Sequence, residues 1–353
     1  MAFSSKNLQG TLSGILFVAI FAMAATYISS LAPIKALGLS PLVIGIVMGI
    51  FYANTLHNQT PKAWQSGITF SAKKILRFAI VLYGFRITFQ QIAEVGMDGF
   101  IVSLIMLTTT LLLGSWVGYR VFSMDKDTSI LTASGAAVCG AAAVLATEPV
   151  LKSEEHKAAI AVSMVVLFGT ISMFLYPLLY ETIIKDATGF LHMDPRTFGI
   201  YVGGTIHEVA QVVAVPASIP NAPEEMANAA VIVKMTRVIM IAPMLIILGL
   251  FLAWSAKKEG GNHNEKMKLV IPWFAVYFIM VAGFNSLHLI PQNIVDIINQ
   301  IDTFLLTMAM TALGMGTIFS KFRGLGLAPI YTATVMFIWL VSAGFVVTKF
   351  ICM

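Results

Sequence analysis

The sequence predicts an all-α, polytopic membrane protein with about 11 transmembrane helices. Three observations support this fold class: the composition, the spacing of the apolar runs and a weak internal repeat. Of the 353 residues, 58% are hydrophobic and 11% are charged, and the mean hydropathy is +0.86. This composition excludes a soluble globular domain. The net charge of +5 is typical of basic cytoplasmic loops, so it gives little support to nucleic-acid binding.

Eleven apolar runs have about the length that an α-helix needs to cross a bilayer. If every run crosses, the positive-inside rule places the N-terminus in the cytoplasm and the C-terminus outside the cell inner membrane. Lys185 and Arg196 would then lie in the cytoplasm, and Lys152 and Lys157 outside. The runs are 11–34, 39–55, 71–94, 99–122, 128–151, 157–183, 196–218, 225–255, 268–288, 293–317 and 327–351.

The run at 128–151 is unusually rich in small residues, and its middle reads Ser134-Gly-Ala-Ala-Val-Cys139-Gly140. Small residues let membrane helices approach closely. Glycine pairs also mark places where a helix can unwind, which is tolerated in a bilayer only inside protein or beside a cavity. Transporters use such broken helices to direct half-helix N-termini at an anionic substrate. The alternative is a continuous, tightly packed helix.

A weak repeat relates the two halves of the chain. We expect an extra N-terminal helix at 1–36, a first repeat at 37–186 and a second at 195–353. Because each repeat holds five runs, the second should be inverted relative to the first, with one broken helix in each, as in secondary transporters. The matched stretches are 43–54 with 197–208, 74–77 with 234–237, and the broken run with 306–316.

Two Lys-x-x-Arg motifs place Lys74, Arg77, Lys234 and Arg237 inside predicted spans. Lys234 is about ten residues into its run, roughly 15 Å deep, and Arg237 is one turn further on the same face. Charges at such depth are costly and indicate function. We expect these cations to bind a small anion. The alternatives are lysines that extend to the membrane surface and cations that pair structurally with carboxylates such as Glu208.

His207 and Glu208 are candidates for coupling transport to H+ or Na+, together with Asn54 and Gln211. Histidine titrates near neutral pH. The alternative is that Glu208 pairs with the cations and only holds them. No second histidine follows at the spacing of a metal site, and no Walker motif is present, so we expect neither a bound metal nor ATP hydrolysis.

The stretch Gly203-Gly-Thr-Ile-His207-Glu208-Val-Ala-Gln211, the paired Lys-x-x-Arg motifs and the stretch around Cys139 resemble the YeiH-type family of proposed sulfate exporters. The similarity extends from about residue 34 to about residue 350. That family is grouped with the bile acid, arsenite and auxin carriers. The resemblance therefore implies a panel domain and a core domain with two crossing broken helices. The second broken stretch, at 311–316, has no cysteine that matches Cys139.

We therefore expect a secondary transporter, not an enzyme, that exports sulfate, a sulfonate or an organic carboxylate by alternating access. Its partners would be the anion and the bilayer, with a homodimer as candidate assembly, and it would have no resident cofactor. The alternatives are a cation- or proton-coupled antiporter with structural basic residues, an intramembrane enzyme using His207 and Glu208, and an anion sensor. The four cations would act with Ser134, Cys139, Gly140, Gly314 and Gly316.

Overall fold

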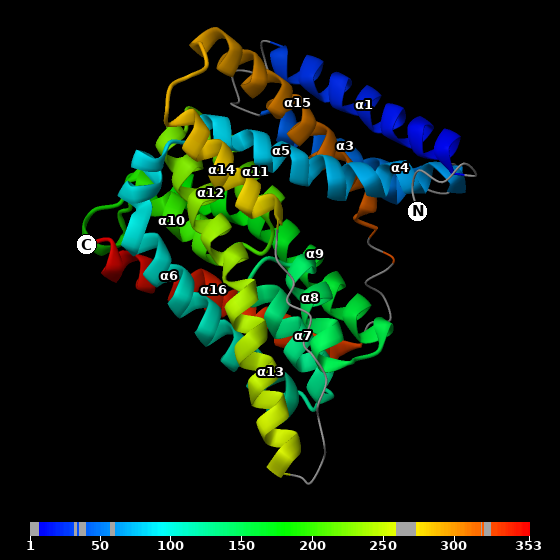
Figure 1. Cartoon of the computed structure of the whole chain (residues 1–353), viewed down its shortest axis with the longest axis vertical. Helices are drawn as coiled ribbons and strands as arrows, with labels where there is room; N and C mark the ends of the chain where they lie inside the picture. The colour runs from blue at the N-terminus through cyan, green and yellow to red at the C-terminus, as the bar shows by residue number, and fades with distance from the viewer. Residues whose placement is uncertain are drawn as a thin grey trace.

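The computed structural model describes residues 7–31, 34, 40–56, 61–258, 273–318, 320 and 326–353. This part of the chain contains helices and turns but no β-strand. Its helices form two groups, a panel across the top of Figure 1 and a larger core below it. Helix α1 (Leu8–Ser30) starts at the right of Figure 1 and the C-terminus lies at the left, and we call these ends the N-terminal side and the C-terminal side.

The panel is held together by close contact between its helices α3 and α15. A Cβ atom on Gly49 would lie 2.3 Å from the Thr311 carbonyl oxygen, and one on Gly314 would lie 2.3 Å from that of Ile46. Only glycine fits at these two positions. The panel comprises α1 (Leu8–Ser30), α3 (Pro41–Thr55), α4 (Gln65–Phe70), the π-helical turn η3 (Ser71–Ile75), α5 (Leu76–Tyr83), the 3₁₀ turn η4 (Gly84–Arg86), α14 (Trp273–Asn285) and α15 (Gln292–Gly316).

The core surrounds two pairs of short helices. The first helix of the core is α6, whose start is capped by the Thr88 side chain, and Gln91 completes the capping box. The boundary between the predicted runs 71–94 and 99–122 was therefore wrong, because a new helix begins at Phe89. The core comprises α6 (Phe89–Trp116), α7 (Lys126–Ala137), α8 (Ala141–Leu151), α9 (Glu155–Leu179), α10 (Pro195–Thr205), α11 (Val209–Ala217), α12 (Glu224–Ile239), α13 (Ile241–Lys258) and α16 (Leu327–Ile351).

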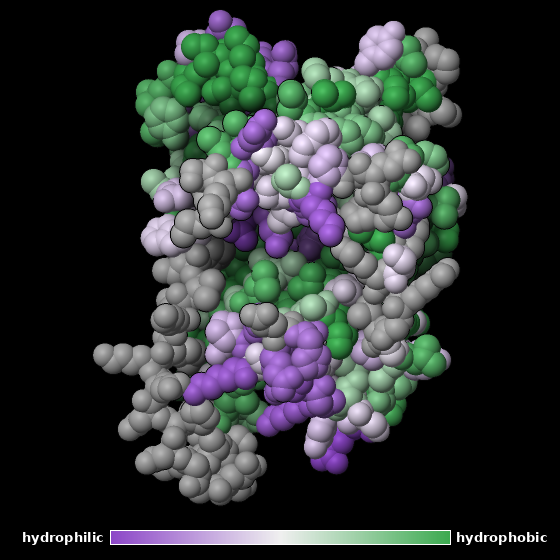
Figure 2. Space-filling view, turned by 90° about the vertical axis from the view of Figure 1, so that its right-hand side faces the viewer, coloured by the Kyte–Doolittle hydropathy of each residue, from purple (hydrophilic) through white to green (hydrophobic). Residues whose placement is uncertain are grey.

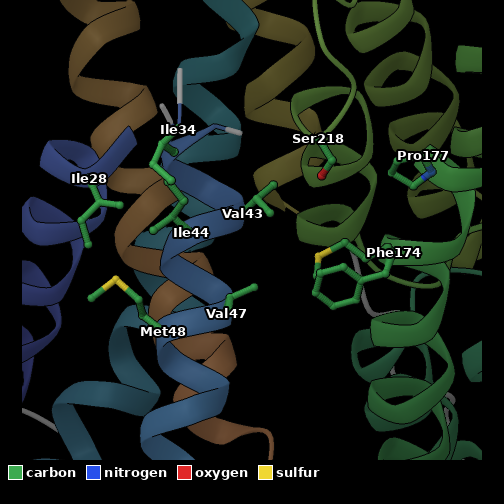
Figure 3. A pocket seen from close by; sticks show the side chains of 10 residues that line it. Ile28, Ile34, Val43, Ile44, Val47, Met48, Phe174, Pro177 and Ser218 are labelled. Atoms are coloured by element: carbon green, nitrogen blue, oxygen red, sulfur yellow. The ribbon is translucent and has the colours of Figure 1, made fainter. Parts of the chain in front are cut away.

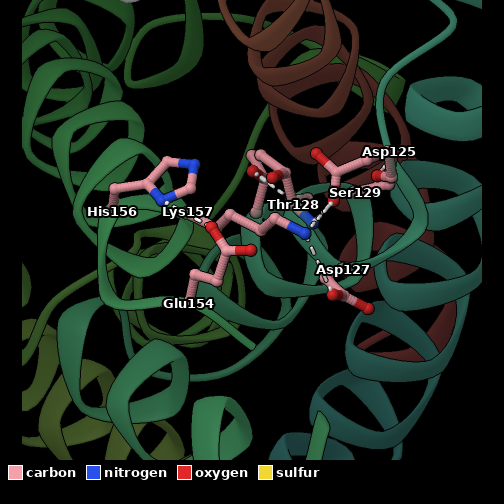
Figure 4. Close-up of polar contacts among 8 residues, drawn as sticks. Asp125, Asp127, Thr128, Ser129, Glu154, His156 and Lys157 are labelled. Carbon is pink, nitrogen blue, oxygen red and sulfur yellow. Dashed lines mark hydrogen bonds and ion pairs between the residues drawn. The ribbon is translucent and has the colours of Figure 1, made fainter. Parts of the chain in front are cut away.

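The first pair, α7 and α8, is a re-entrant hairpin, which we call hairpin 1. Lys157, near the start of α9, lies 3.1 Å from carboxylate oxygens of both Asp125 and Asp127, which flank the start of α7 (Figure 4). The chain therefore enters through α7 and returns through α8 to the same side. Each helix is about 16–18 Å long, about half the thickness of the hydrocarbon core. The prediction that residues 128–151 cross the membrane was wrong, although the predicted interruption is present at Val138–Gly140.

The second pair, α10 and α11, is also a hairpin, which we call hairpin 2, and its tip is at 206–208. A Cβ atom on Gly199 would lie 2.4 Å from the Met226 carbonyl oxygen, and one on Gly203 would lie 2.3 Å from that of Ala230. Residue numbers rise together along this contact, so α10 and α12 run parallel and start on the same side. Between them, α11 must bring the chain back.

The two hairpins enter from opposite sides, and α6 provides the reference. Arg196, at the start of α10, lies 3.0 Å from Asp98 near the start of α6. Just past the other end of α6, in the π-helical turn Val117–Val121, a Cβ atom on Gly118 would lie 2.8 Å from the Ser129 hydroxyl in the first turn of α7. Hairpin 1 therefore enters from the N-terminal side and hairpin 2 from the C-terminal side.

Six helices in the described ranges are long and apolar enough to cross a membrane, and three shorter ones are apolar. Because two of the eleven predicted runs are hairpins, the count of eleven crossings is not supported. The cytoplasmic position of the N-terminus and the division into inverted repeats stay predictions. Figure 2 looks at the N-terminal side, where hydrophilic side chains gather between apolar flanks. The six long segments are Leu8–Ser30, Phe89–Val121, His156–Ile184, Glu224–Leu252, Gln292–Gly316 and Leu327–Ile351.

Compared with eleven crossings, the hairpins change the side on which two loops lie: the loop between α8 and α9 and the loop that follows α9. Cysteine labelling can test this change. In a variant without native cysteines, Glu154→Cys should label from the same side as Lys62→Cys, and Thr188→Cys should label from the opposite side. The eleven-crossing topology predicts the reverse for both loops. Labelling of Glu154→Cys from the side opposite to Lys62→Cys, with Thr188→Cys on the side of Lys62→Cys, would contradict the hairpin arrangement.

Candidate functional site

The tips of the two hairpins meet inside the core, where Lys234 of α12 joins them. Its Nζ atom donates hydrogen bonds of 2.7 Å to the carbonyl oxygens of Val138, Ile206 and His207. The first carbonyl belongs to hairpin 1 and the other two to hairpin 2. The side chain is fully buried. Lys234 therefore supplies the donors that these interrupted helices lack.

Arg237, one turn further along α12, supplies donors to backbone carbonyls that lie just before the hairpin tips in the sequence. Its guanidinium donates to the Gly204 carbonyl oxygen at 2.6 Å, and to those of Ala136 at 3.3 Å and Ala137. Both cations thus face the C-terminal ends of α7 and α10, where helix dipoles place partial negative charge. Both side chains are fully buried, and their predicted depth in the bilayer stays a prediction. The carbonyl partners favour a structural role for the two cations, which was the alternative to anion binding, but the partners are backbone groups and not the carboxylates of that alternative.

A carboxylate faces the opposite ends of the short helices. Glu208 is the N-cap of α11 and forms a capping box with Gln211, whose Oε1 accepts from the Glu208 N–H at 3.0 Å. The Oε1 atom of Glu208 accepts a hydrogen bond of 3.5 Å from the Ala141 N–H, in the first turn of α8. One side chain therefore faces the N-termini of both returning helices. Gly140 allows this approach, because a Cβ atom there would lie 2.5 Å from Glu208 Cγ, and its φ is +70°.

A cavity of about 550 Å³ lies between the panel and these tips. Cys139 and Glu208 line it from the hairpins, and Arg77 from the panel. The Arg77 guanidinium lies 5.8 Å from the centre of the Phe274 ring and forms no ion pair with any described residue. The cavity extends to Glu148 and Ala158, beside the loop that joins α8 to α9. It is therefore directed toward the N-terminal side.

A second hollow, of about 490 Å³, separates panel and core elsewhere and is almost wholly apolar. Figure 3 shows Val43 and Val47 of α3 on one side of the gap, with Phe174 and Pro177 of α9 on the other. No ionic group lines it. Apolar surfaces without directional bonds put little constraint on the relative position of the two groups.

The expected cluster of four cations does not form. Lys74 is exposed on the panel and lines a different surface hollow, with Gln65 and Lys73. Arg77 lines the cavity, whereas Lys234 and Arg237 are buried behind the hairpin tips. Lys73 and Glu148, which the candidate site omitted, also line the cavity. The apolar sequence around Glu148 was the available signal for that residue.

The second interruption was predicted in the wrong segment. Helix α15 is continuous through Gly316, so it offers no half-helix N-terminus at 311–316. Its small residues serve close packing against α3, and Thr311 donates to the Thr307 carbonyl within the helix at 2.8 Å. The actual break, at 206–208, follows the glycine pair that begins at Gly203.

The other predicted residues are dispersed around the tips and the panel. Ser134 is buried and donates to the Leu131 carbonyl within α7 at 2.9 Å. Asn54 donates to the Thr317 carbonyl at 3.0 Å, just past the end of α15. His207 is buried in the tip, and its Nδ1 has no partner among the described residues. No group of three or more possible metal-binding side chains occurs in the described ranges.

The fold and the site define a helical, polytopic membrane protein in which two re-entrant hairpins meet from opposite sides. The chain belongs to the UPF0324 family. The family model "Conserved hypothetical protein 698" matches residues 13–333. A UPF0324 membrane protein of Pseudomonas putida is 46% identical over 340 residues, 96% of this chain and 93% of that protein. The UPF0324 inner membrane protein YeiH of Escherichia coli K12 is 44% identical over 339 residues, 96% of this chain and 94% of that protein.

If Lys234 holds the tips together, Lys234→Met should destabilise the fold by about 3 kcal/mol or more, because three buried carbonyls lose their donor. Thermal unfolding in detergent would measure this loss, with Lys74→Gln as the exposed control. Arg237→Gln should also destabilise the fold, and adding Glu208→Gln should not restore stability. Restoration would show that Arg237 depends on that carboxylate instead of the carbonyls.

Proposed function

We propose that the protein is a secondary transporter, not an enzyme, that exports a small anion across the inner membrane. The main support for this proposal is that the N-termini of two half-length helices, α8 and α11, meet at the cavity between panel and core. N-terminal N–H groups and the helix dipole favour anions. Sulfate, a sulfonate or an organic carboxylate fits this chemistry.

In this proposal Arg77 provides the charged contact with the substrate. Its guanidinium can form paired hydrogen bonds to a carboxylate or sulfo group, and no acidic side chain in the described part of the chain neutralises it. Lys73 adds a second positive charge at the wall of the cavity. Lys234 and Arg237 hold the tips in place and do not touch the anion.

Alternating access would come from movement of the core against the panel. The cavity lies at their interface and is directed toward the N-terminal side, and the apolar hollow offers little resistance to sliding. The hairpin tips would carry the anion from one side to the other while the Lys234 contacts stay intact. The proposed export direction takes the N-terminal side, which holds Lys62, as cytoplasmic.

Arg77→Gln should weaken anion binding by roughly tenfold or more, since a charge-assisted hydrogen bond is lost. Uptake and binding of sulfate, methanesulfonate and succinate in proteoliposomes would measure this effect. Lys74→Gln is the matched control, because it removes a nearby charge outside the cavity. Equal transport by Arg77→Gln and wild type, for every anion transported, would contradict the proposed contact.

A further inference from the structure

We propose that the Glu208 carboxylate occupies the anion position in this structure and must take up a proton before the substrate can bind. The transporter would then carry one proton together with each anion. This inference rests on the proposed function and adds its coupling mechanism. It assigns Glu208 the role of a tethered anion that competes with the substrate.

The proposal rests on the contacts that Glu208 makes at the hairpin tips. The Glu208 side chain accepts from the backbone in the first turn of α11, and its Oε1 lies 3.5 Å from the Ala141 nitrogen of α8. These are the N–H groups that a substrate anion would use. The same side chain lines the cavity, so it separates the bound position from the open space. A substrate that reaches the tips therefore meets a site that already holds a negative charge.

Two anions cannot share this position, because like charges in a partly buried site repel strongly. The cations behind the tips do not relieve the repulsion, since Lys234 and Arg237 are already bonded to six carbonyl oxygens. Protonation removes the charge of Glu208 and makes it a poorer acceptor. The neutral side chain can then release both N-termini and move into the cavity.

The other charged and titratable groups around Glu208 are few. The panel presents Lys73 and Arg77, hairpin 1 presents Cys139 and Glu148, and His207 precedes Glu208 in the chain. Helices α9, α14 and α15 present only apolar residues to the cavity. Glu148 and Glu208 are therefore the acids that line this space, and only Glu208 touches the helix N-termini.

The experiment compares anion binding by wild type, Glu208→Gln and Glu148→Gln at about pH 5 and about pH 8. Sulfate, methanesulfonate and succinate are the probes, and thermal shift gives the affinity. Wild type should bind its anion roughly tenfold or more tightly at the lower pH. Glu208→Gln should bind tightly at both pH values, because a neutral amide mimics the protonated acid. Glu148→Gln should retain the wild-type pH dependence.

Proton uptake provides a second readout on the unaltered protein. Adding the anion to wild type in weakly buffered solution near neutral pH should consume about one proton per site. Anion binding without proton uptake and with equal affinity at both pH values would overturn the coupling and leave the proposed transporter intact. Persistence of the pH dependence in Glu208→Gln would likewise overturn the assignment to Glu208. No binding of any of the three anions, by wild type or by Glu208→Gln, would overturn the anion site itself.

Discussion

The arrangement depends on how the broken ends of four short helices are satisfied inside the membrane. Each interrupted helix leaves backbone groups without partners, and an unpaired group in hydrocarbon costs several kcal/mol. Lys234 and Arg237 resolve this at the C-terminal ends of α7 and α10, where three carbonyls bond to each cation. The carbonyls in turn replace the water that these buried charges lose. Neither the hairpins nor the cations would be stable at this depth without the other.

The N-terminal ends of α8 and α11 are satisfied differently, and this asymmetry links structure to the proposed function. Fixed side chains from behind the tips close the C-terminal ends, whereas Glu208 covers the N-terminal ends from the side of the cavity. In the proposed mechanism, only the N-terminal ends exchange one anionic partner for another. The glycine contacts within panel and core make each group compact, while the hollows between them leave room for relative movement.

Composition and spacing predicted the helical membrane fold, and Gly140 correctly marked the first interruption. They did not distinguish a hairpin from a crossing helix, because two half-length helices occupy as many residues as one full span. The useful signal was the charge pattern of Asp125, Asp127 and Lys157, which places both ends of hairpin 1 together. The position of Lys234 inside a long apolar run indicated a buried cation, but its partners are backbone carbonyls that no sequence pattern identifies. With a hairpin in each half of the chain, the odd number of crossings that predicted inversion no longer follows.

Cross-linking tests the hairpin arrangement most directly. A protein with cysteines only at positions 127 and 157, in native membranes, would be treated with a short bifunctional thiol reagent and analysed for the intramolecular product. The hairpin arrangement predicts efficient cross-linking, because the native side chains at these positions are 3.1 Å apart. Cysteines at 127 and 188 should not cross-link, since they lie on opposite sides. Failure of the 127–157 pair, with both cysteines reactive from opposite sides of the membrane, would contradict the hairpin and the site built on it.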